Sequence, residues 1–281
     1  MAATPSPSDR STVVARLRAA GCVFAEDEAR LLMSAARTPA DLAALVERRV
    51  TGNPLEHVLG WAQFCGLRIA VDAGVFVPRP RTEFLVHQAA ALTRPGAVVV
   101  DLCCGSGAIG VALAAAIGPL ELYAVEVDPV AVRCARRNVA AAGGQVLQGD
   151  LYAPLPASLQ RRVDILVVNA PYVPTGAIGL LPAEARLHEP RVALDGGEDG
   201  LDVQRRVAAA AARWLAPGGH LLIETSAHQA AETVAVVARA GLSPRVATSD
   251  DPDATVIVGS RSIGLDGNHM DGTHMDGNDM E

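Results

Sequence analysis

The stretch that decides the fold is Val98-Val99-Val100-Asp101-Leu102-Cys103-Cys104-Gly105-Ser106-Gly107-Ala108-Ile109-Gly110. It reads as a buried apolar strand, a glycine turn and the start of a helix. Glycines at 105 and 107 let the backbone approach a ligand closely, and the helix start offers free N–H groups. Gly105 to Gly110 also fits the GxGxxG spacing of dinucleotide enzymes, so the loop alone does not identify its ligand.

Two carboxylates near this loop favour S-adenosyl-L-methionine as the cofactor. Asp101 ends the strand, where a carboxylate suits an ammonium group and would repel a pyrophosphate. Glu126 ends the next strand and can accept hydrogen bonds from two ribose hydroxyls, which fits NAD as well. Cys103 is a small residue that we expect to line the cofactor loop. A tight turn that binds nothing is disfavoured, because glycine turn and spaced acid occur together.

Downstream of the loop, apolar strands alternate with helical patterns, which is typical of βαβ units and a mainly parallel sheet. We expect seven strands, at 97–101, 120–126, 145–148, 163–168, 219–224, 245–247 and 254–258. Upstream, residues 8–50 have the spacing of short amphipathic helices, and Phe64-Cys65-Gly66-Leu67 indicates a β-hairpin. Thr82, after two prolines, is predicted to cap a further helix.

These patterns divide the chain into four expected parts. Residues 1–56 form a small helical domain that docks the substrate, and 57–80 form a β-hairpin linker. Residues 81–262 form the catalytic α/β domain. Residues 263–281 repeat an Asp-Gly pentapeptide without a packing face, which predicts a disordered low-complexity tail.

Composition excludes several classes of protein. Net charge is −7 and all 24 basic residues are arginine, so no basic face for direct nucleic-acid binding is expected. Five cysteines lie without a CxxC pair, which favours a reducing cytoplasm. No run of about 18 apolar residues predicts a membrane span, no metal site is predicted, and a monomer is the default.

The segment Val163 to Tyr172 carries the most information about the reaction, because its strand ends in Asn169-Ala170-Pro171-Tyr172. Ligands of doubly wound sheets bind beyond the carboxyl ends of the strands, so Asn169 is expected to face the same crevice as Glu126. An amide nitrogen is a poor nucleophile, and a site that methylates it must hold both N–H groups and aim the nitrogen. The Asn169 side-chain oxygen and the Ala170 carbonyl are the expected acceptors. Pro171 fixes the direction of that carbonyl, and Tyr172 can stack on a planar group. The alternative is an Asn-Xaa-Pro turn that merely closes a strand.

Taken in order, these motifs resemble the protein-glutamine N5-methyltransferases, a family that modifies bacterial release factors and, in a sister group, a ribosomal protein. The resemblance covers roughly residues 50 to 260. Besides the two loops above, it rests on Pro54–Gly60, Phe64–Leu67, Val77–Glu83, Gly149–Tyr152, Glu189-Pro190, Gly196–Leu201 and Leu215–Gly219 followed by Glu224.

This resemblance implies a class I, Rossmann-like methyltransferase that transfers a methyl group from S-adenosyl-L-methionine to the N5 amide of a glutamine in a release factor or another translation protein. Gly105 and Gly107 would lie against the methionine part of the cofactor, and Glu126 would bind its ribose. Asp150 and Leu151 would flank the adenine. The segment Asn169–Tyr172 would hold the glutamine side chain.

The chain departs from the family pattern at several points. Ala170 replaces the first proline of Asn-Pro-Pro-Tyr, and Cys103 stands where a glycine is usual. Thr225 follows Glu224 in place of a glycine. These differences mark a divergent branch.

Three other functions remain as alternatives. A nucleic-acid amino-methyltransferase, acting on adenine N6 or guanine N2, would use a similar Asn-Xaa-Pro-aromatic loop. An NAD-dependent dehydrogenase would need a catalytic His or Lys; the chain has no Lys, and His188 lies in a segment that the resemblance explains. A cofactor-binding scaffold without activity would not need Asn169. His57 and His188 are both expected to be structural.

Overall fold

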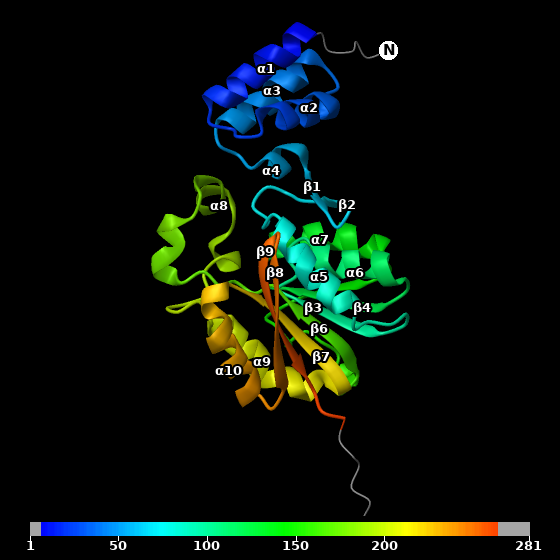
Figure 1. The fold of residues 1–281 in the computed structure, drawn as a ribbon. Coiled ribbons are helices and arrows are strands. Elements are labelled where there is room, and N and C mark those ends of the chain that lie inside the picture. The colour runs from blue at the N-terminus through cyan, green and yellow to red at the C-terminus, as the bar shows by residue number, and fades with distance from the viewer. Residues whose placement is uncertain (1–6, 264–281) are drawn as a thin grey trace, which may run out of the picture.

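A computed structural model describes residues 7–263 of the 281-residue chain. The tail predicted to be disordered lies, apart from residue 263, outside the described residues. Four helices form the N-terminal part, which Figure 1 shows as a separate layer beyond the sheet. They are α1 (Pro7–Ala19), α2 (Ala25–Ala35), α3 (Pro39–Val50) and α4 (Leu55–Leu59).

The N-terminal helices share a small apolar core around Leu17, Leu32 and Val46. Helix α3 begins with a proline and is capped by Thr38, whose side chain accepts a hydrogen bond from the Asp41 N–H. Helix α4 was not predicted, and it overlaps the start of the linker expected at residues 57–80. Gly60 ends it in the left-handed conformation at φ 80°.

The predicted hairpin is present as β1 (Trp61–Phe64) and β2 (Leu67–Ala70), which pair antiparallel with Phe64 opposite Leu67. Both turn residues between them have positive φ, 47° at Cys65 and 75° at Gly66, as a tight hairpin turn requires. Phe64 and Ile69 are fully buried against the catalytic domain.

The prediction of a mainly parallel seven-stranded sheet is confirmed. Its order is β5-β4-β3-β6-β7-β9-β8. The first five strands are parallel to one another, and β9 pairs antiparallel with both of its neighbours, β7 and the edge strand β8. The strands are β3 (Val98–Leu102), β4 (Glu121–Glu126), β5 (Gln145–Gln148), β6 (Val163–Val168), β7 (Leu215–Thr225), β8 (Ser243–Asp250) and β9 (Asp253–Ser260).

Helices cover both faces of this sheet (Figure 1). On one face lie α5 (Glu83–Ala90), α6 (Ala108–Ile117) and α7 (Pro129–Ala141), and on the other α9 (Asp202–Trp214) and α10 (Ala230–Arg239). Successive side chains of β3 alternate between the two resulting cores. Because both faces are covered, this strand is apolar almost throughout.

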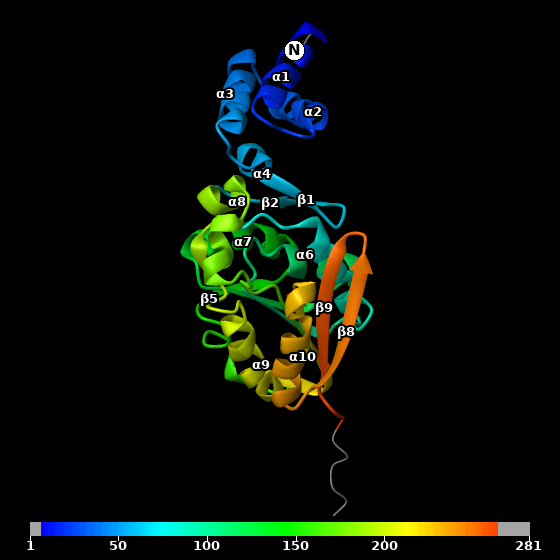
Figure 2. The same cartoon turned by 60° about the vertical axis from the view of Figure 1, so that its left-hand side comes forward.

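The insertion between β6 and α9 lies beside the N-terminal part and contains α8 (Ala183–His188), as Figures 1 and 2 show. Arg49 of α3 joins the two parts. Its guanidinium contacts Glu28 of α2 at 2.6 Å and Glu184 of α8 at 2.6 Å, and its side chain is only 9% exposed. Short 3-10 helices complete the fold at Pro80–Thr82, Ala157–Leu159, Thr175–Leu180, Arg191–Ala193 and Ala227–Gln229.

The prediction that Thr82 caps a helix is wrong. Pro80 starts a 3-10 turn ahead of α5, so Thr82 already has helical dihedral angles and makes no capping hydrogen bond. Its hydroxyl instead accepts a hydrogen bond from the Asn169 side chain. Within residues 7–263, no helix is long and apolar enough to cross a membrane.

Candidate active site

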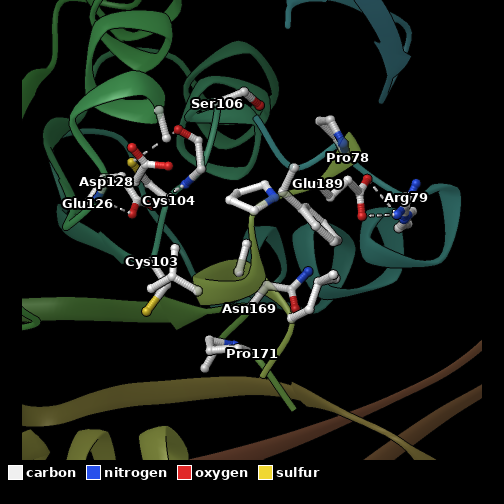
Figure 3. A pocket seen from close by; sticks show the side chains of 18 of the residues that line it. Pro78, Arg79, Cys103, Cys104, Ser106, Glu126, Asp128, Asn169, Pro171 and Glu189 are labelled. Atoms are coloured by element: carbon white, nitrogen blue, oxygen red, sulfur yellow. Dashed lines mark hydrogen bonds and ion pairs between the residues drawn. The ribbon is translucent and has the colours of Figure 1, made fainter. Parts of the chain in front are cut away.

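One cavity of about 570 Å³ opens beyond the carboxyl ends of β3, β4 and β6, a volume typical of a small-molecule site. It gathers nearly all of the residues predicted from sequence. Lining residues include Cys103, Gly105, Glu126, Asp150, Leu151 and the whole segment Asn169–Tyr172. Figure 3 shows Glu126 and Cys104 on one side of this cavity, and Arg79 with Glu189 on the other. Asp101 and Gly107 do not line it.

Glu126 ties the end of β4 to the glycine turn. Its Oε2 accepts a hydrogen bond from the Gly105 N–H at 2.8 Å, and its Oε1 accepts from the N–H groups of Val127 and Asp128 at 2.8 and 3.0 Å. Burial raises the pKa of this carboxyl, and the three N–H donors oppose that rise. The carboxylate is therefore held rigidly at the cavity wall.

Asp101 lies beneath the loop rather than in the cavity. It is fully buried, and its Oδ2 accepts a hydrogen bond from the Gly110 N–H at 3.0 Å, at the start of α6. Its Oδ1 has no hydrogen-bond partner among the described residues. The contact with the cofactor's ammonium group stays a prediction. In the structure, the Asp101 side chain links β3 to α6 through its hydrogen bond with Gly110.

The buried Asp101 carboxyl predicts a specific pH dependence of stability. Burial raises its pKa from 3.8 to about 7, so the folded protein holds this proton more tightly than the unfolded chain. Its contribution is therefore complete below pH 3.8 and is lost as pH rises through about 7. Between about pH 5.5 and pH 8, the unfolding free energy of the wild type should fall by roughly 2 kcal/mol relative to Asp101→Asn. Denaturant titration of both proteins at the two pH values, without cofactor, measures this; a constant difference would contradict it.

The loop backbone explains why glycine is usual at position 103 in the resembling family. Cys103 has φ 55°, in the left-handed region that disfavours residues with a Cβ. Cys104 is buried and Cys103 is half-buried, and desolvation, together with the nearby carboxylates Glu126 and Asp101, raises the pKa of both thiols above the ordinary value. Neither is suited to act as a nucleophile.

The two loop glycines should respond differently to alanine. A Cβ at Gly107 would stand 2.6 Å from a Val139 methyl group at φ 78°, whereas a Cβ at Gly105 would meet nothing within 4 Å at φ 55°. Gly107→Ala is expected to lower the unfolding free energy by about 2–4 kcal/mol, and Gly105→Ala by only about 1 kcal/mol. Gly105→Ala should instead weaken cofactor binding, because its methyl group would enter the part of the cavity in which the cofactor is expected. Thermal unfolding and calorimetric titration of the pair check this; equal stabilities would refute the packing argument.

Asp150 and Leu151, predicted to flank an adenine, follow β5 and line the cavity together with Arg206 of α9, which pairs with Asp150. Leu151 has φ 48° and is buried. Leu151 and Trp214 belong to one buried apolar cluster against which Tyr152 packs, and the rings of Tyr152 and Trp214 stack at 5.7 Å between centroids.

The segment Asn169–Tyr172, which follows β6, lines the same cavity (Figure 3). Asn169 donates from Nδ2 to Thr82 Oγ1 at 3.3 Å. Within residues 7–263, no donor bonds to the Ala170 carbonyl. The Tyr172 hydroxyl accepts a hydrogen bond from Arg81 at 2.8 Å and donates to Glu224 Oε1 at 3.3 Å. Burial, with Glu224 beside it, raises the pKa of Tyr172 to about 12, so Tyr172 is a neutral wall residue.

Sequence reasoning did not foresee the role of the Pro-Arg-Pro segment. Arg79 contacts both carboxylate oxygens of Glu189 at 2.6 Å, and Glu189 also accepts from the Val77 N–H at 3.2 Å. This pair fastens the β6–α9 insertion over the cavity. Arg81, Thr82 and Glu224 likewise gather around Asn169 and Tyr172. All of these residues stood in the resembling motifs, but their contacts were not visible there.

The two histidines do not take part. His57 is buried in α4, and its Nε2 lies 2.7 Å from the Val75 carbonyl. His188 ends α8 outside the cavity lining. Among the described residues, no group of three His, Cys, Asp or Glu side chains could hold a metal ion.

The chain is similar in sequence and in fold to known methyltransferases. A family model described as the methyltransferase small domain matches residues 67–198. A release factor glutamine methyltransferase of Geobacter sulfurreducens is 39% identical over 228 residues, 79% of each chain. A 4-amino-L-phenylalanine/4-methylamino-L-phenylalanine methyltransferase of Streptomyces pristinaespiralis is 40% identical over 203 residues, 70% of this chain and 69% of its own. A methyltransferase structure from Pyrococcus furiosus has a TM-score of 0.53 at 16% identity, over 70% of this chain and 90% of that one, and shares the fold.

Sheet order, glycine turn and the acid at the end of β4 define a class I S-adenosyl-L-methionine-dependent methyltransferase. Within that class, the chain belongs to the release factor glutamine methyltransferase family. The prediction of family, fold and methyltransferase activity is thereby confirmed.

Proposed function

We propose that this enzyme methylates the side-chain amide nitrogen (N5) of a glutamine in a protein, a peptide chain release factor or another translation protein. One observation carries the proposal. The Asn169 amide and the Ala170 carbonyl, which has no hydrogen-bond donor among residues 7–263, line the cavity beside the cofactor loop, where two acceptors can hold the two N–H groups of a primary amide.

The chemistry required of these residues is mainly orientation. When bound, S-adenosyl-L-methionine supplies a methyl group on a positively charged sulfur. Asn169 Oδ1 and the Ala170 carbonyl would each accept one N–H and so turn the nitrogen toward that methyl group. The nitrogen lone pair would form the new N–C bond, and the sulfur of the cofactor would keep the electrons of the C–S bond. The nitrogen then loses one of its acidified protons to solvent, so no strong base is needed.

The cavity fits the cofactor on chemical grounds. At Gly105 a Cβ would meet no protein atom, so the turn leaves room for a ligand, and Glu126 sets a fixed carboxylate for ribose hydroxyls beside it. In this arrangement Cys103, Gly105 and Gly107 would form the loop around the methionine part, with Asp101 as its buried support. Asp150 and Leu151 would border the adenine.

We further propose that residues 1–56 dock the protein substrate. The enzyme would act as a monomer in the cytoplasm, without direct contact to nucleic acid. The ion pairs of Arg49 with Glu28 and Glu184 support this arrangement, because they hold the N-terminal helices against the insertion that lines the cavity. Residues 57–80 would act as the linker and 81–262 as the catalytic domain.

A second candidate acceptor is a small aromatic amine. It is favoured by the similarity to the Streptomyces pristinaespiralis enzyme, whose name gives amino-phenylalanine substrates. An aromatic amine also offers an N–H to Asn169. It would not need the N-terminal helices, which weighs against it as the main substrate.

Tritium-methyl labelling of a cell lysate separates these possibilities. We expect one labelled protein, insensitive to nuclease, in which mass spectrometry finds a methylated glutamine in a release factor. Asn169→Ala enzyme serves as the control and should leave that protein unlabelled. A nuclease-sensitive acceptor would instead identify an adenine or guanine enzyme, and label found only in small molecules an amine methyltransferase.

A further inference from the structure

Tyr172 is held at both ends of its residue. Its hydroxyl accepts a hydrogen bond from Arg81 Nη2 at 2.8 Å and donates one to Glu224 Oε1 at 3.3 Å. Its backbone carbonyl accepts a hydrogen bond from Gln229 Nε2 at 3.0 Å. The Arg81 guanidinium also lies over the ring, 6.0 Å from its centroid. Together these contacts fix the direction in which the ring points from the backbone.

Glu224 carries its carboxylate where charge is costly. It stands near the carboxyl end of β7, the strand that pairs with β6. Its side chain is only 2% exposed, and its Oε2 has no hydrogen-bond partner among residues 7–263. Both the Tyr172 hydroxyl and the Arg81 guanidinium lie at the other oxygen, Oε1. A buried carboxylate oxygen without a donor lowers stability, so packing alone does not account for this residue.

The Arg81 guanidinium is shared between Tyr172 and Glu224. An arginine beside a carboxylate usually contacts both of its oxygens, as Arg79 does with Glu189 at 2.6 Å. Arg81 instead places Nη2 at 2.8 Å from the Tyr172 hydroxyl and Nε at 3.6 Å from a single oxygen of Glu224. The guanidinium therefore lies closer to the hydroxyl than to the carboxylate, and the charged pair is arranged around the tyrosine.

We propose that Arg81 and Glu224 are positioning residues, which act through the Tyr172 hydroxyl and fix the ring against which the planar acceptor amide lies. This inference rests on the proposed function. Tyr172 and Asn169 line the same cavity, so a fixed ring limits the rotation of an amide that Asn169 holds. The direction of the nitrogen relative to the methyl group governs the rate of transfer. An amide beside a loosely held ring would still bind, so the loss belongs in kcat rather than in KM.

A double-mutant cycle on Arg81 and Tyr172 tests this route. The probe is a release-factor fragment with its target glutamine, whose steady-state methylation gives kcat and KM. Arg81→Met removes both contacts and should lower kcat about 10-fold, with KM changed by less than about 2-fold. Tyr172→Phe keeps the ring, removes the hydroxyl and should lower kcat by a similar factor. In the double variant the two losses should not multiply, and kcat should stay within about 2-fold of either single variant.

Two further variants complete the cycle. Glu224→Gln keeps the size of the side chain without its charge, and it should lower kcat in the wild-type background but not in Tyr172→Phe. Arg68→Met is the matched control and should leave kcat unchanged. The Arg68 guanidinium likewise lies over an aromatic ring, 4.2 Å from the Trp61 centroid, but outside the cavity lining.

The possible outcomes separate positioning from a merely structural role. A structural role would lower the Tm of Arg81→Met equally in both backgrounds and leave kcat of the folded enzyme unchanged, which would overturn the inference. Losses that multiply to about 100-fold in the double variant would overturn it as well. A wild-type enzyme that leaves the fragment unmethylated would overturn the proposed function and this inference with it, whereas multiplying losses in an active enzyme would overturn the inference alone.

Discussion

Asn169→Ala is expected to lower kcat about 10²- to 10³-fold while leaving the affinity for S-adenosyl-L-methionine nearly unchanged. Removing one preorganised hydrogen-bonding group from an active site typically has an effect of this size. Asn169 would act on the acceptor nitrogen, and within residues 7–263 its side chain hydrogen-bonds to Thr82 alone. Single-turnover methylation and calorimetric titration of the cofactor, made on the same preparation, measure the two quantities.

The design separates loss of chemistry from loss of fold. Alanine at 169 leaves the buried strand β6 intact, because the replaced side chain lies beyond its last residue, Val168. Thermal unfolding should therefore shift little. A variant that kept more than about a tenth of the wild-type kcat would show that Asn169 merely closes the strand, and the acceptor would then have to be held elsewhere.

Sequence patterns were most reliable where one chain segment determines its own structure. The predicted bounds of β6, at 163–168, and of β5, at 145–148, agree with the structure, because each strand is bounded by its own turn residues. Cavity residues at the strand ends were also predictable, since the carboxyl ends of parallel strands meet at one edge. This reasoning brought Glu126 and Asn169 to one site.

Contacts between distant segments could not be read in this way. Thr82 and Asn169 are 87 residues apart, and Arg79 and Glu189 are 110 apart. Thr82 has the residue type and position of a helix cap, and only the turn that begins at Pro80 places it elsewhere. Period-two alternation directs the Asp101 side chain toward α6, a contact that the local sequence did not indicate, and its expected contact with the cofactor stays a prediction. Local sequence patterns therefore located the cavity at the strand ends. The hydrogen bonds and ion pairs within it depend on tertiary contacts between distant segments.

Glu126→Gln is expected to weaken S-adenosyl-L-methionine binding by about 100-fold. Glutamine preserves the size of the side chain but replaces one acceptor oxygen with an NH₂ group. That group would face the N–H of Gly105 or those of Val127 and Asp128, donor against donor. The loss of charge-assisted bonds to ribose and to the loop should amount to roughly 3 kcal/mol, which corresponds to about two powers of ten in Kd.

Glu121→Gln is the matched control for this variant, since Glu121 begins the same strand and has an exposed ion pair with Arg162. Loss of that pair should change stability by less than about 1 kcal/mol and cofactor affinity not at all. If Glu126→Gln raised KM for the protein substrate while the cofactor Kd stayed at its wild-type value, Glu126 would belong to the acceptor side of the cavity. The opposite pattern, with Kd raised and single-turnover kcat at saturating cofactor preserved, would separate Glu126 from Asn169 and assign binding and orientation to different strands of the sheet.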